Sequence, residues 1–469
     1  MPVSSAIPLE TLQSVFAENQ FFDNKTWRLS PQPFALEDSL RQELGAIGKA
    51  CMDFHRAIEN LYYKSVEKKS ILRNGQLITP WVADYLERGK PDNIVRWNRM
   101  RAQSGSLPAV IRPDLLLTED GFALTEMDSV PGGIGLTAYL NRLYAGNNDD
   151  LIGSFEAMLD GFYYSVAQAA PDREAPLIAI VVSEEAATYR PEMEWLASQL
   201  QERGRRVFCH YPEDLIPLGD ALFRDGEGNP EKIDIIYRFF ELYELDTLPN
   251  SDFIMNAWEK GEVALSPPPK TYQEEKLTLA LFHHHLLGEY WKDHLPRSSR
   301  KTLSRLIPRS WVIDPTPLPP GAILDGPTAQ NRPLHQWEDL TQASQKERNL
   351  ILKISGFHHD AEGARSVLLG SDCSKEEWTE GLQDAIKNAS RNPHILQEYR
   401  KPARRQHDLY DGEGKIAPGE GRVRICPYYF THERETPKPA GILCTFCPSD
   451  KKIIHGMTDA AMLPARRAD

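Results

Sequence analysis

Residues 109–128 read AVIRPDLLLTEDGFALTEMD, and this stretch decides the fold. The apolar run over 109–117 predicts one β-strand, and the alternating pattern over 122–128 predicts a second. Between them, the Asp120-Gly121 pair is a favoured hairpin turn, because its backbone twist matches that of the flanking strands. We therefore expect a β-hairpin at this point of the chain.

Charged side chains stand at alternate positions of this hairpin: Arg112, Asp114, Glu126 and Asp128. Residues two apart on a strand point to the same face, so pairing would gather three carboxylates and one guanidinium. Carboxylates packed this closely repel one another unless a cation neutralises them. Oxygen ligands without His or Cys suit Mg²⁺, and an arginine beside them suits a phosphate. A solvated hairpin face would show the same alternation, so the spacing alone leaves both interpretations open.

The segments around the hairpin predict two further units. Apolar residues recur at helical spacing over 37–67, so the start of the chain is expected to be helical. After the hairpin, strands at Leu177–Val182, Arg206–Cys209 and Ile233–Arg238 enclose a helix at Pro191–Arg203. Strands that alternate with helices indicate a small parallel sheet of Rossmann-like type.

Beyond the proline run at 267–269 the pattern becomes α+β. A glycine- and charge-rich stretch, Asp411–Gly421, is expected to be a mobile loop. The regular elements expected in this part are a helix at Glu274–Leu287, a strand at Leu350–Ile354, a helix at Lys375–Ala389, and strands at His394–Arg400, near Val423–Thr431 and at Gly441–Cys447.

Composition argues against several classes of protein. The formal charge is −13, from 54 Lys+Arg and 67 Asp+Glu, whereas nucleic-acid binding rests on clustered cations. Six cysteines do not make a disulfide framework, and the N-terminus lacks the basic and apolar segments of a signal peptide. The sequence has no apolar run of about 18 residues, the length that would predict a membrane span. We expect a protein of a reducing compartment, cytoplasmic by default, with small-molecule partners.

The hairpin charges resemble the signature of glutathionylspermidine synthases and related circularly permuted ATP-grasp proteins. That signature is Arg-x-Asp, eleven residues, Glu-x-Asn, and here Arg112-x-Asp114 precedes Glu126-x-Asp128 by eleven residues. The resemblance implies that Asp114, Glu126 and Asp128 hold magnesium and that Arg112 contacts the transferred phosphate. Asp128 replaces the family's Asn and adds one negative charge, and Val130-Pro131 replaces Thr-Pro.

Downstream residues are similar to the family's nucleotide site in type and order. Lys276 resembles the lysine that precedes an apolar helix and reaches an ATP phosphate. Lys353 resembles the strand lysine ahead of a glycine loop, here with Gly356 and Gly363, that closes over phosphates. The strand that meets adenine and ribose is matched by the pair Gln397 and Glu398.

Arginines near the predicted site are the next candidates. The family's last glycine-bearing strand carries an arginine that is used with the acidic substrate or phosphate. Gly441–Cys447 has none, so Arg424 or Arg422 on the preceding strand would supply that charge. Arg238 ends the third strand of the parallel sheet, and such strand ends face ligand crevices, so it is expected to help bind the acceptor.

The pair Cys444-x-x-Cys447 lies on a predicted strand and has no second such pair. Redox and zinc motifs use a helix N-terminus or a further pair of ligands, so we interpret these residues as two buried thiols.

The resemblance implies a mixed α+β and α/β fold of the ATP-grasp, glutathione synthetase-like kind. It divides the chain into a helical N-terminal region (1–105), a permuted part of the core with the hairpin (106–170), a Rossmann-like pre-ATP-grasp domain (171–265), and the ATP-grasp core and lid (266–469). The implied function is an ATP- and Mg²⁺-dependent carboxylate–amine ligase that joins a small acid and an amine through an acylphosphate. Two alternatives stay open: a catalytically decayed nucleotide-binding or scaffold protein, and a phosphotransferase that stops at the phosphorylated product.

Overall fold

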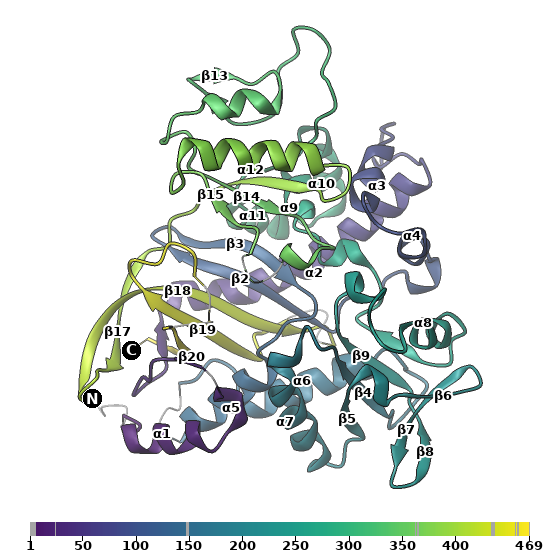
Figure 1. The fold of residues 1–469 in the computed structure, drawn as a ribbon, viewed down its shortest axis with the longest axis vertical. Coiled ribbons are helices and arrows are strands. Elements are labelled where there is room, and N and C mark those ends of the chain that lie inside the picture. Colours follow the sequence, from purple (N-terminus) through teal and green to yellow (C-terminus); the bar gives the residue numbers. More distant parts are fainter. Residues whose placement is uncertain are drawn as a thin grey trace.

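The computed structural model describes residues 6–23, 25–146, 150–361, 363, 365–432, 437–454, 456 and 459–468. The central element is a seven-stranded sheet in the order β1-β20-β19-β18-β2-β3, with β17 paired to β18 (Figure 1). Its strands are β1 (Phe34–Leu36), β2 (Val110–Thr118), β3 (Gly121–Asp128), β17 (Arg404–Tyr410), β18 (Ile416–Phe430), β19 (Gly441–Pro448) and β20 (Ala461–Arg467).

The predicted hairpin is present and pairs with strands from the end of the chain. In β2 and β3, Arg112 lies opposite Asp128 and Asp114 opposite Glu126, as the alternation predicted. Strand β2 also pairs antiparallel with β18, where Arg424 lies opposite Leu116. Segments that are far apart in the sequence therefore form one surface.

Helices cover the central sheet from both sides. Tyr429 and Phe430 are neighbours on β18 and point to opposite faces. The Tyr429 hydroxyl donates to the Leu44 carbonyl oxygen (2.6 Å) of α2 (Asp38–Val66). The helix can approach this ring because it carries Gly48 there, where a Cβ would lie 2.5 Å from the ring. On the other face, Phe430 packs on α6 (Phe155–Ala167), which lies beside α5 (Ile134–Ala145).

The predicted parallel sheet is confirmed, with strand order β10-β9-β4-β5. Every residue of β4 is buried, which explains its unbroken apolar sequence. Its elements are β4 (Ile178–Val182), α7 (Arg190–Gln201), β5 (Val207–His210), β9 (Ile235–Phe239), α8 (Ser251–Glu259) and β10 (Ala264–Ser266), with the small antiparallel sheet β6 (Ile216–Leu218), β7 (Ala221–Gly226) and β8 (Asn229–Lys232) beside them.

A third sheet, antiparallel in the order β11-β16-β14-β15, lies at the top of Figure 1 with α12 next to it. It has a core of its own, around the fully buried Trp378 of α12. Its elements are β11 (Ser310–Val312), β14 (Leu350–Ile354), β15 (Leu368–Leu369), α12 (Lys375–Asn388) and β16 (His394–Glu398). Between β11 and β14 the chain forms a separate two-stranded sheet of β12 (Thr328–Ala329) and β13 (Arg332–Pro333).

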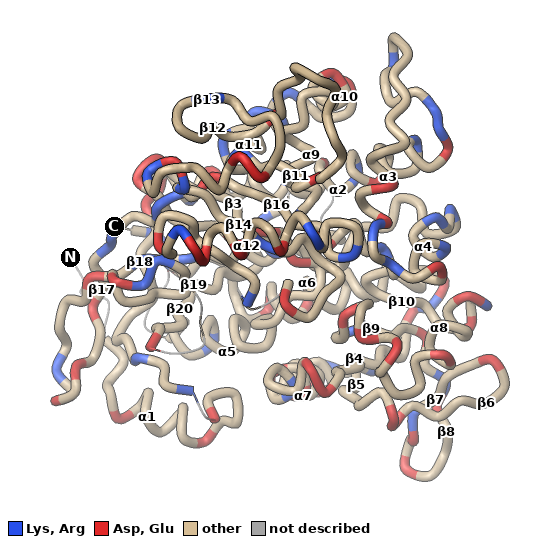
Figure 2. The backbone as a smooth tube through the Cα atoms, turned by 45° about the horizontal axis from the view of Figure 1, so that its top comes forward, with Lys and Arg blue, Asp and Glu red and all other residues tan. Residues whose placement is uncertain are grey.

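The remaining helices are α1 (Leu9–Ala17), α3 (Pro80–Glu87), α4 (Asp92–Asn98), α9 (Leu277–His283), α10 (Gly288–His294) and α11 (Arg297–Leu306). Within the described parts of the chain, no helix is both long and apolar enough to cross a membrane. Lys/Arg and Asp/Glu are interspersed along the backbone tube of Figure 2.

Two sequence predictions are wrong. The helix expected at Glu274–Leu287 is interrupted: α9 begins at Leu277, ends at His283, and is followed by a separate 3₁₀ turn. The loop expected at Asp411–Gly421 is largely a strand, because β18 already begins at Ile416 and pairs there with Tyr410 of β17. The glycines and charges of that stretch belong to a hairpin that extends the central sheet.

Candidate functional site

The charged face of the β2–β3 hairpin is held together by Arg112. Its Nε donates to Asp114 Oδ1 (2.9 Å), and its Nη2 lies 2.9 Å from Asp128 Oδ2. Its Nη1 donates to the carbonyl oxygen of Gly132 (3.1 Å), just after the hairpin. Burial alone would lower the pKa of Arg112, but the two carboxylates raise it well above its usual value, so the guanidinium stays charged.

Asp114 is buried between partners from two strands. Besides Arg112, it accepts from Nη1 of Arg424 (2.9 Å) and from the thiol of Cys426 (3.3 Å), both on β18. Both of its carboxylate oxygens are therefore engaged by the protein. The structure places Arg424 next to the hairpin. Its role in place of the arginine that Gly441–Cys447 lacks stays a prediction.

The metal site of Asp114, Glu126 and Asp128 stays a prediction. Within the described residues, no three His, Cys, Asp or Glu side chains are grouped so that they could hold a metal ion. The repulsion that a metal was expected to relieve is instead relieved by Arg112, Arg424 and Lys276. The oxygens of Asp114 are engaged by two arginines and the Cys426 thiol. Glu126 and Asp128 differ from it, since their side chains are 34% and 30% exposed.

Glu126 is the point where two lysines from separate elements meet the hairpin. Lys276, the residue before α9, places its Nζ 3.1 Å from Glu126 Oε2 and also donates to the Ala361 carbonyl oxygen (3.0 Å). Lys353 of β14 donates to the carbonyl oxygen of the neighbouring Thr125 (2.9 Å). Burial would raise the pKa of Glu126, but the two lysines and Arg112 hold it at about 2, so this carboxylate is ionised at neutral pH.

Lys353 is buried and has neutral hydrogen-bond acceptors. Its Nζ donates to Gln397 Oε1 (3.1 Å), and Gln397 in turn donates from Nε2 to Ser310 Oγ (2.9 Å). Burial and then the nearby Lys276 lower the pKa of Lys353 to about 8, against the pull of Glu126. Gln397 thus lies buried behind the lysine and orients it, while its neighbour Glu398 is partly exposed and pairs with Arg400 (3.1 Å).

Asp128, which replaces the Asn of the family signature, has a carboxylate near those of Glu126 and Asp114. Its Oδ1 accepts from the backbone N–H of Val130 (3.0 Å). Burial raises its pKa above the usual value, and Glu126 and Asp114 add to that effect against the opposing charge of Arg112. The extra negative charge is therefore only partly compensated.

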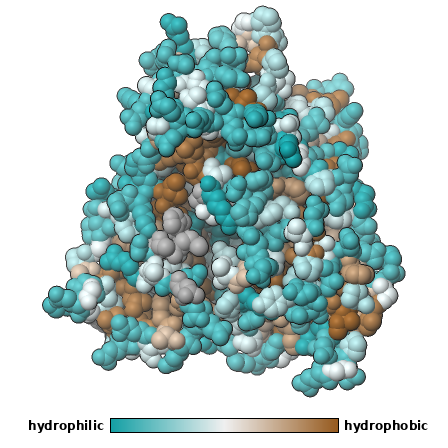
Figure 3. All heavy atoms as spheres, in the orientation of Figure 1, coloured by the Kyte–Doolittle hydropathy of each residue, from teal (hydrophilic) through white to brown (hydrophobic). Residues whose placement is uncertain are grey.

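The glycine loop after β14 lies over Lys276 and reaches the parallel sheet. Gly363 has a left-handed backbone (φ +60°), which favours glycine, whereas Glu362 next to it lies outside the described residues. Arg365 and His359 both contact Glu185, on the loop that follows β4, at 3.3 and 3.2 Å. Figure 3 shows a recess between the upper part of the molecule and the central sheet. The loop therefore bridges two units of the molecule.

Arg238 lies at the carboxyl end of β9, as predicted, but its side chain has no exposed surface. It donates to the carbonyl oxygens of Pro267 (3.1 Å) and Phe240 (3.0 Å) and is paired with Glu274, which also accepts from Ser129 Oγ (2.9 Å). A buried guanidinium must be fully paired within the protein. Arg238 thus forms a structural link to the end of the hairpin, and its contact with an acceptor substrate stays a prediction.

One acidic residue near the site gave no signal in the sequence. Glu192 of α7 is buried and accepts backbone N–H groups of Gly133 (2.7 Å) and Leu136 (2.9 Å) at the start of α5. Burial raises its pKa to about 7 against those two hydrogen bonds. A glutamate on an amphipathic helix is expected to face solvent, so only the assembled structure reveals this contact.

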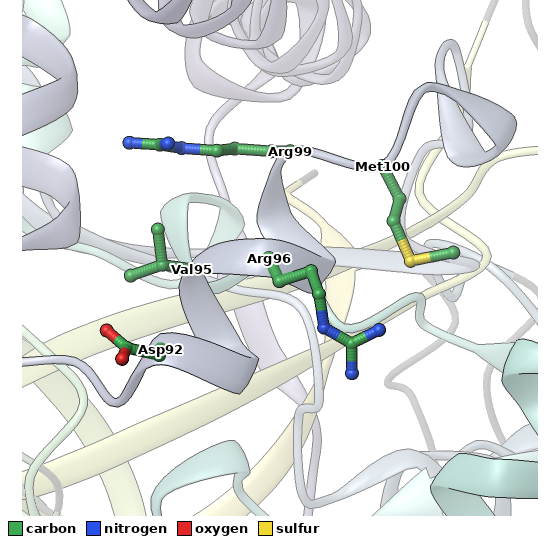
Figure 4. A pocket seen from close by; sticks show the side chains of 5 residues that line it. All are labelled: Asp92, Val95, Arg96, Arg99 and Met100. Atoms are coloured by element: carbon green, nitrogen blue, oxygen red, sulfur yellow. The ribbon is translucent and has the colours of Figure 1, made fainter.

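An open cavity of about 380 Å³ lies elsewhere, on α4, and is lined by Asp92, Val95, Arg96, Arg99 and Met100 (Figure 4). The two arginines extend in different directions in that view, and each has a carboxylate partner: Glu259 for Arg96 (2.6 Å) and Glu87 for Arg99 (2.7 Å). None of the predicted site residues lines it. The chemistry of the hairpin and this cavity are separate features.

The six cysteines form no disulfide bond, and Cys444 and Cys447 are buried within β19. They are three residues apart on a strand and so point to opposite faces. This arrangement agrees with the interpretation of two buried thiols.

The sequence matches no protein-family model and no curated protein. Among solved structures, a glutathione synthetase-like effector from Globodera pallida, in the apo form, is 12% identical. The alignment covers 100% of this chain and 99% of that chain, with a TM-score of 0.54. A putative gamma-glutamylcysteine synthetase from Methylobacillus flagellatus is 12% identical over 81% of this chain and 86% of that chain (TM-score 0.42). D-alanyl-alanine synthetase A from Vibrio cholerae is 9% identical over 62% and 90% of the two chains (TM-score 0.26). From the full-length likeness to the first of these structures, the chain has the mixed α/β fold of glutathione synthetase-like, ATP-grasp structures, and the predicted fold class is confirmed.

Proposed function

We propose that this protein is an ATP-dependent carboxylate–amine ligase that forms an amide bond through an acylphosphate. The observation that carries the proposal is the convergence of Lys276 and Lys353 on Glu126 of the hairpin, within a glutathione synthetase-like fold. These two lysines, with Arg112 and Arg424, exceed the three carboxylates of the hairpin by one positive charge, so they form a wall with a small net positive charge. Such a wall suits the phosphates of a nucleotide.

In the proposed complex, Lys276 and Lys353 hold the phosphates of ATP. Glu126 and Asp128, the two partly exposed carboxylates, would hold the Mg²⁺ that accompanies ATP, and this metal would neutralise phosphate charge. Arg112 is fixed by Asp114, Asp128 and the Gly132 carbonyl, and in this proposal it contacts the transferred phosphate. The loop after β14 excludes water above Lys276.

The reaction has two steps. A carboxylate oxygen of the acid attacks the γ-phosphorus of ATP, the bond to the β-phosphate oxygen breaks, and ADP leaves. The amine nitrogen then attacks the acyl carbon, the C–O bond to phosphate breaks, and the amine loses a proton as the amide forms. The protein contributes position and charge neutralisation in both steps.

Calorimetric titration with ATP, with and without Mg²⁺, tests the nucleotide site. Lys353→Met and Glu126→Gln are expected to weaken Mg²⁺-dependent binding at least about tenfold, since each removes a buried or partly buried charge from the site. Lys346→Met is the matched control, because Lys346 is an exposed lysine on the loop before β14. Equal affinities for all four proteins, or no binding by the wild type, would refute the proposed site.

A second observation favours one of the alternatives. The engaged oxygens of Asp114 leave fewer carboxylates for the metal on ATP than the family signature implies. A nucleotide-binding protein without catalysis would bind ATP and release no ADP with any acid. A phosphotransferase would release ADP with the acid alone, whereas a ligase would release more ADP when acid and amine are both present.

A further inference from the structure

A buried ion pair lies directly behind the two lysines of the site. Lys90, on the connection between α3 and α4, donates to Glu275 Oε1 (2.6 Å), and the two side chains are only 1% and 3% exposed. Removing two charges from water is unfavourable unless the pair makes further good contacts. Glu275 directly precedes Lys276, so the pair acts on the segment that carries a site lysine.

Ser355 connects this pair to the second lysine. It lies two residues after Lys353 and donates from its hydroxyl to Glu275 Oε2. In the other direction, the backbone N–H of Lys276 donates to the Ser355 carbonyl oxygen (2.9 Å), and that of Leu277 donates to the Ser355 hydroxyl (2.9 Å). The start of α9 and the end of β14 are therefore joined through one serine and one glutamate.

The same pair borders the start of the loop that covers Lys276. A Cβ on Gly356 would lie 3.0 Å from the Glu275 carboxylate, so the chain passes close to the buried charge. The next residue, Phe357, has a left-handed backbone (φ +46°), which is strained for a side chain of this size. Lys90 Nζ lies 5.5 Å from the centre of the Phe357 ring, which packs against the core of the parallel sheet.

We propose that Lys90 is a positioning residue: through Glu275 and Ser355 it fixes Lys276 and Lys353 relative to each other and anchors the loop after β14. This inference rests on the proposed role of the two lysines in binding nucleotide. Without its cation, the Glu275 carboxylate must find water or another partner. The hydrogen bonds that Ser355 makes then loosen together.

The chain offers a matched control in a second buried pair, Lys270 and Glu59. Their side chains are 1% and 11% exposed, and the pair also ties the N-terminal helical region to the segment before α9. Lys270 donates to the carbonyl oxygens of Gln103 and Ser106. It does not donate to the residues of the Ser355 network, which are Glu275, Lys276, Leu277 and Ser355. A loss of fold stability alone should therefore look the same in both lysine variants.

The first measurement is amide hydrogen exchange in the absence of nucleotide. In Lys90→Met, the backbone amides of Lys276 and Leu277 are expected to exchange about tenfold faster than in Lys270→Met, compared at equal stability in urea. The double variant Lys90→Met/Glu275→Gln keeps an oxygen for Ser355 and removes the unpaired charge. It is expected to recover most of the protection, and Glu275→Gln alone supplies the comparison if Lys90→Met does not fold.

The second measurement is the affinity for MgATP in the same variants. Lys90→Met is expected to bind about tenfold more weakly than Lys270→Met, with recovery in the double variant. Equal exchange at the two amides, or equal loss of affinity in the two lysine variants, would overturn the inference. A wild type that binds no ATP would refute the proposed function only, because the exchange comparison still decides whether Lys90 holds the network.

Discussion

Lys353 on β14 and Arg238 on β9 are both buried cations near the end of a strand, yet their surroundings differ. Arg238 is paired with the Glu274 carboxylate and with two backbone carbonyls, all of which belong to the protein's internal framework. Among the described residues, the hydrogen-bond acceptors of Lys353 are neutral, the Thr125 carbonyl and the Gln397 amide, and its pKa is lowered to about 8 by burial and by Lys276. A buried cation that lacks a carboxylate of its own gains from an anionic ligand, whereas one with a complete set of partners does not.

The largest expected effect is the loss of stability when Arg238, the cation with a carboxylate partner, is replaced. Arg238→Met should destabilise the protein by about 3–5 kcal/mol, because it leaves Glu274 without its partner and breaks the link to Ser129. Urea denaturation followed by circular dichroism measures this loss. Lys353→Met serves as the control, since it removes a cation without leaving a dedicated carboxylate partner. A stable Arg238→Met protein that had lost only acceptor binding would reverse the two assignments.

The second prediction concerns Lys353 and the dependence of protein stability on pH. Its folded pKa of about 8 lies below the ordinary value of 10.5, so the native state binds fewer protons than the unfolded state between these values. The protein should therefore gain stability as pH rises from about 8 to 10.5, by up to about 3 kcal/mol, and Lys353→Met should lack this gain. Urea midpoints of the two proteins between pH 7 and 10 measure it. If the urea midpoints of the two proteins changed in parallel with pH, the Lys353 amine would not be desolvated.

Nucleotide binding should change the protonation of the Lys353 amine. Phosphates favour the charged amine, so ATP should raise the pKa of Lys353, cause proton uptake near pH 8, and bind more weakly as pH rises further. Calorimetry in buffers with different ionisation enthalpies gives the number of protons taken up. The uptake should vanish in Lys353→Met and persist in Lys346→Met.

The smallest expected effect concerns Glu126, whose pKa is lowered by the charges of both lysines. Its folded pKa of about 2 lies below the ordinary 4.5, held down by Lys276, Lys353 and Arg112 against the effect of burial. The resulting stability is present above pH 4.5 and is lost as pH falls toward 2. Because the side chain is partly exposed, screening limits this term to about 1 kcal/mol. Glu126→Gln should flatten the acid limb of the stability curve, and an unchanged limb would mean that the lysines do not act on this group.

Local pattern was sufficient for the hairpin and the parallel sheet. Strand alternation alone placed Arg112 and Asp114 on one face, because the period of a strand is fixed by its backbone. Arg238 was also placed correctly at a strand end, but its role depended on Glu274 and on backbone groups from another segment. Sequence position identified where these cations lie and not which partners they have.

Contacts between distant segments explain the remaining errors. The Asp114 carboxylate is engaged by Arg424, 310 residues away, and no local pattern indicates this contact. Lys276 was expected inside a helix, yet it precedes α9 because Ser355 caps the segment from outside. Residues 416–421 carry glycines and charges typical of a loop, and they form a strand because β17 pairs with them and β19 joins at Gly421.

The pairing of β2 with β18 bears on how the chain folds during synthesis. The hairpin leaves the ribosome long before its neighbour on the sheet, and one edge of β2 stays unpaired until then. An exposed apolar edge is a template for wrong pairing, and contacts between distant residues slow folding. Nascent chains that end before residue 416 should therefore bind chaperones or aggregate, and slower translation of the last quarter of the message should lower the yield of native protein.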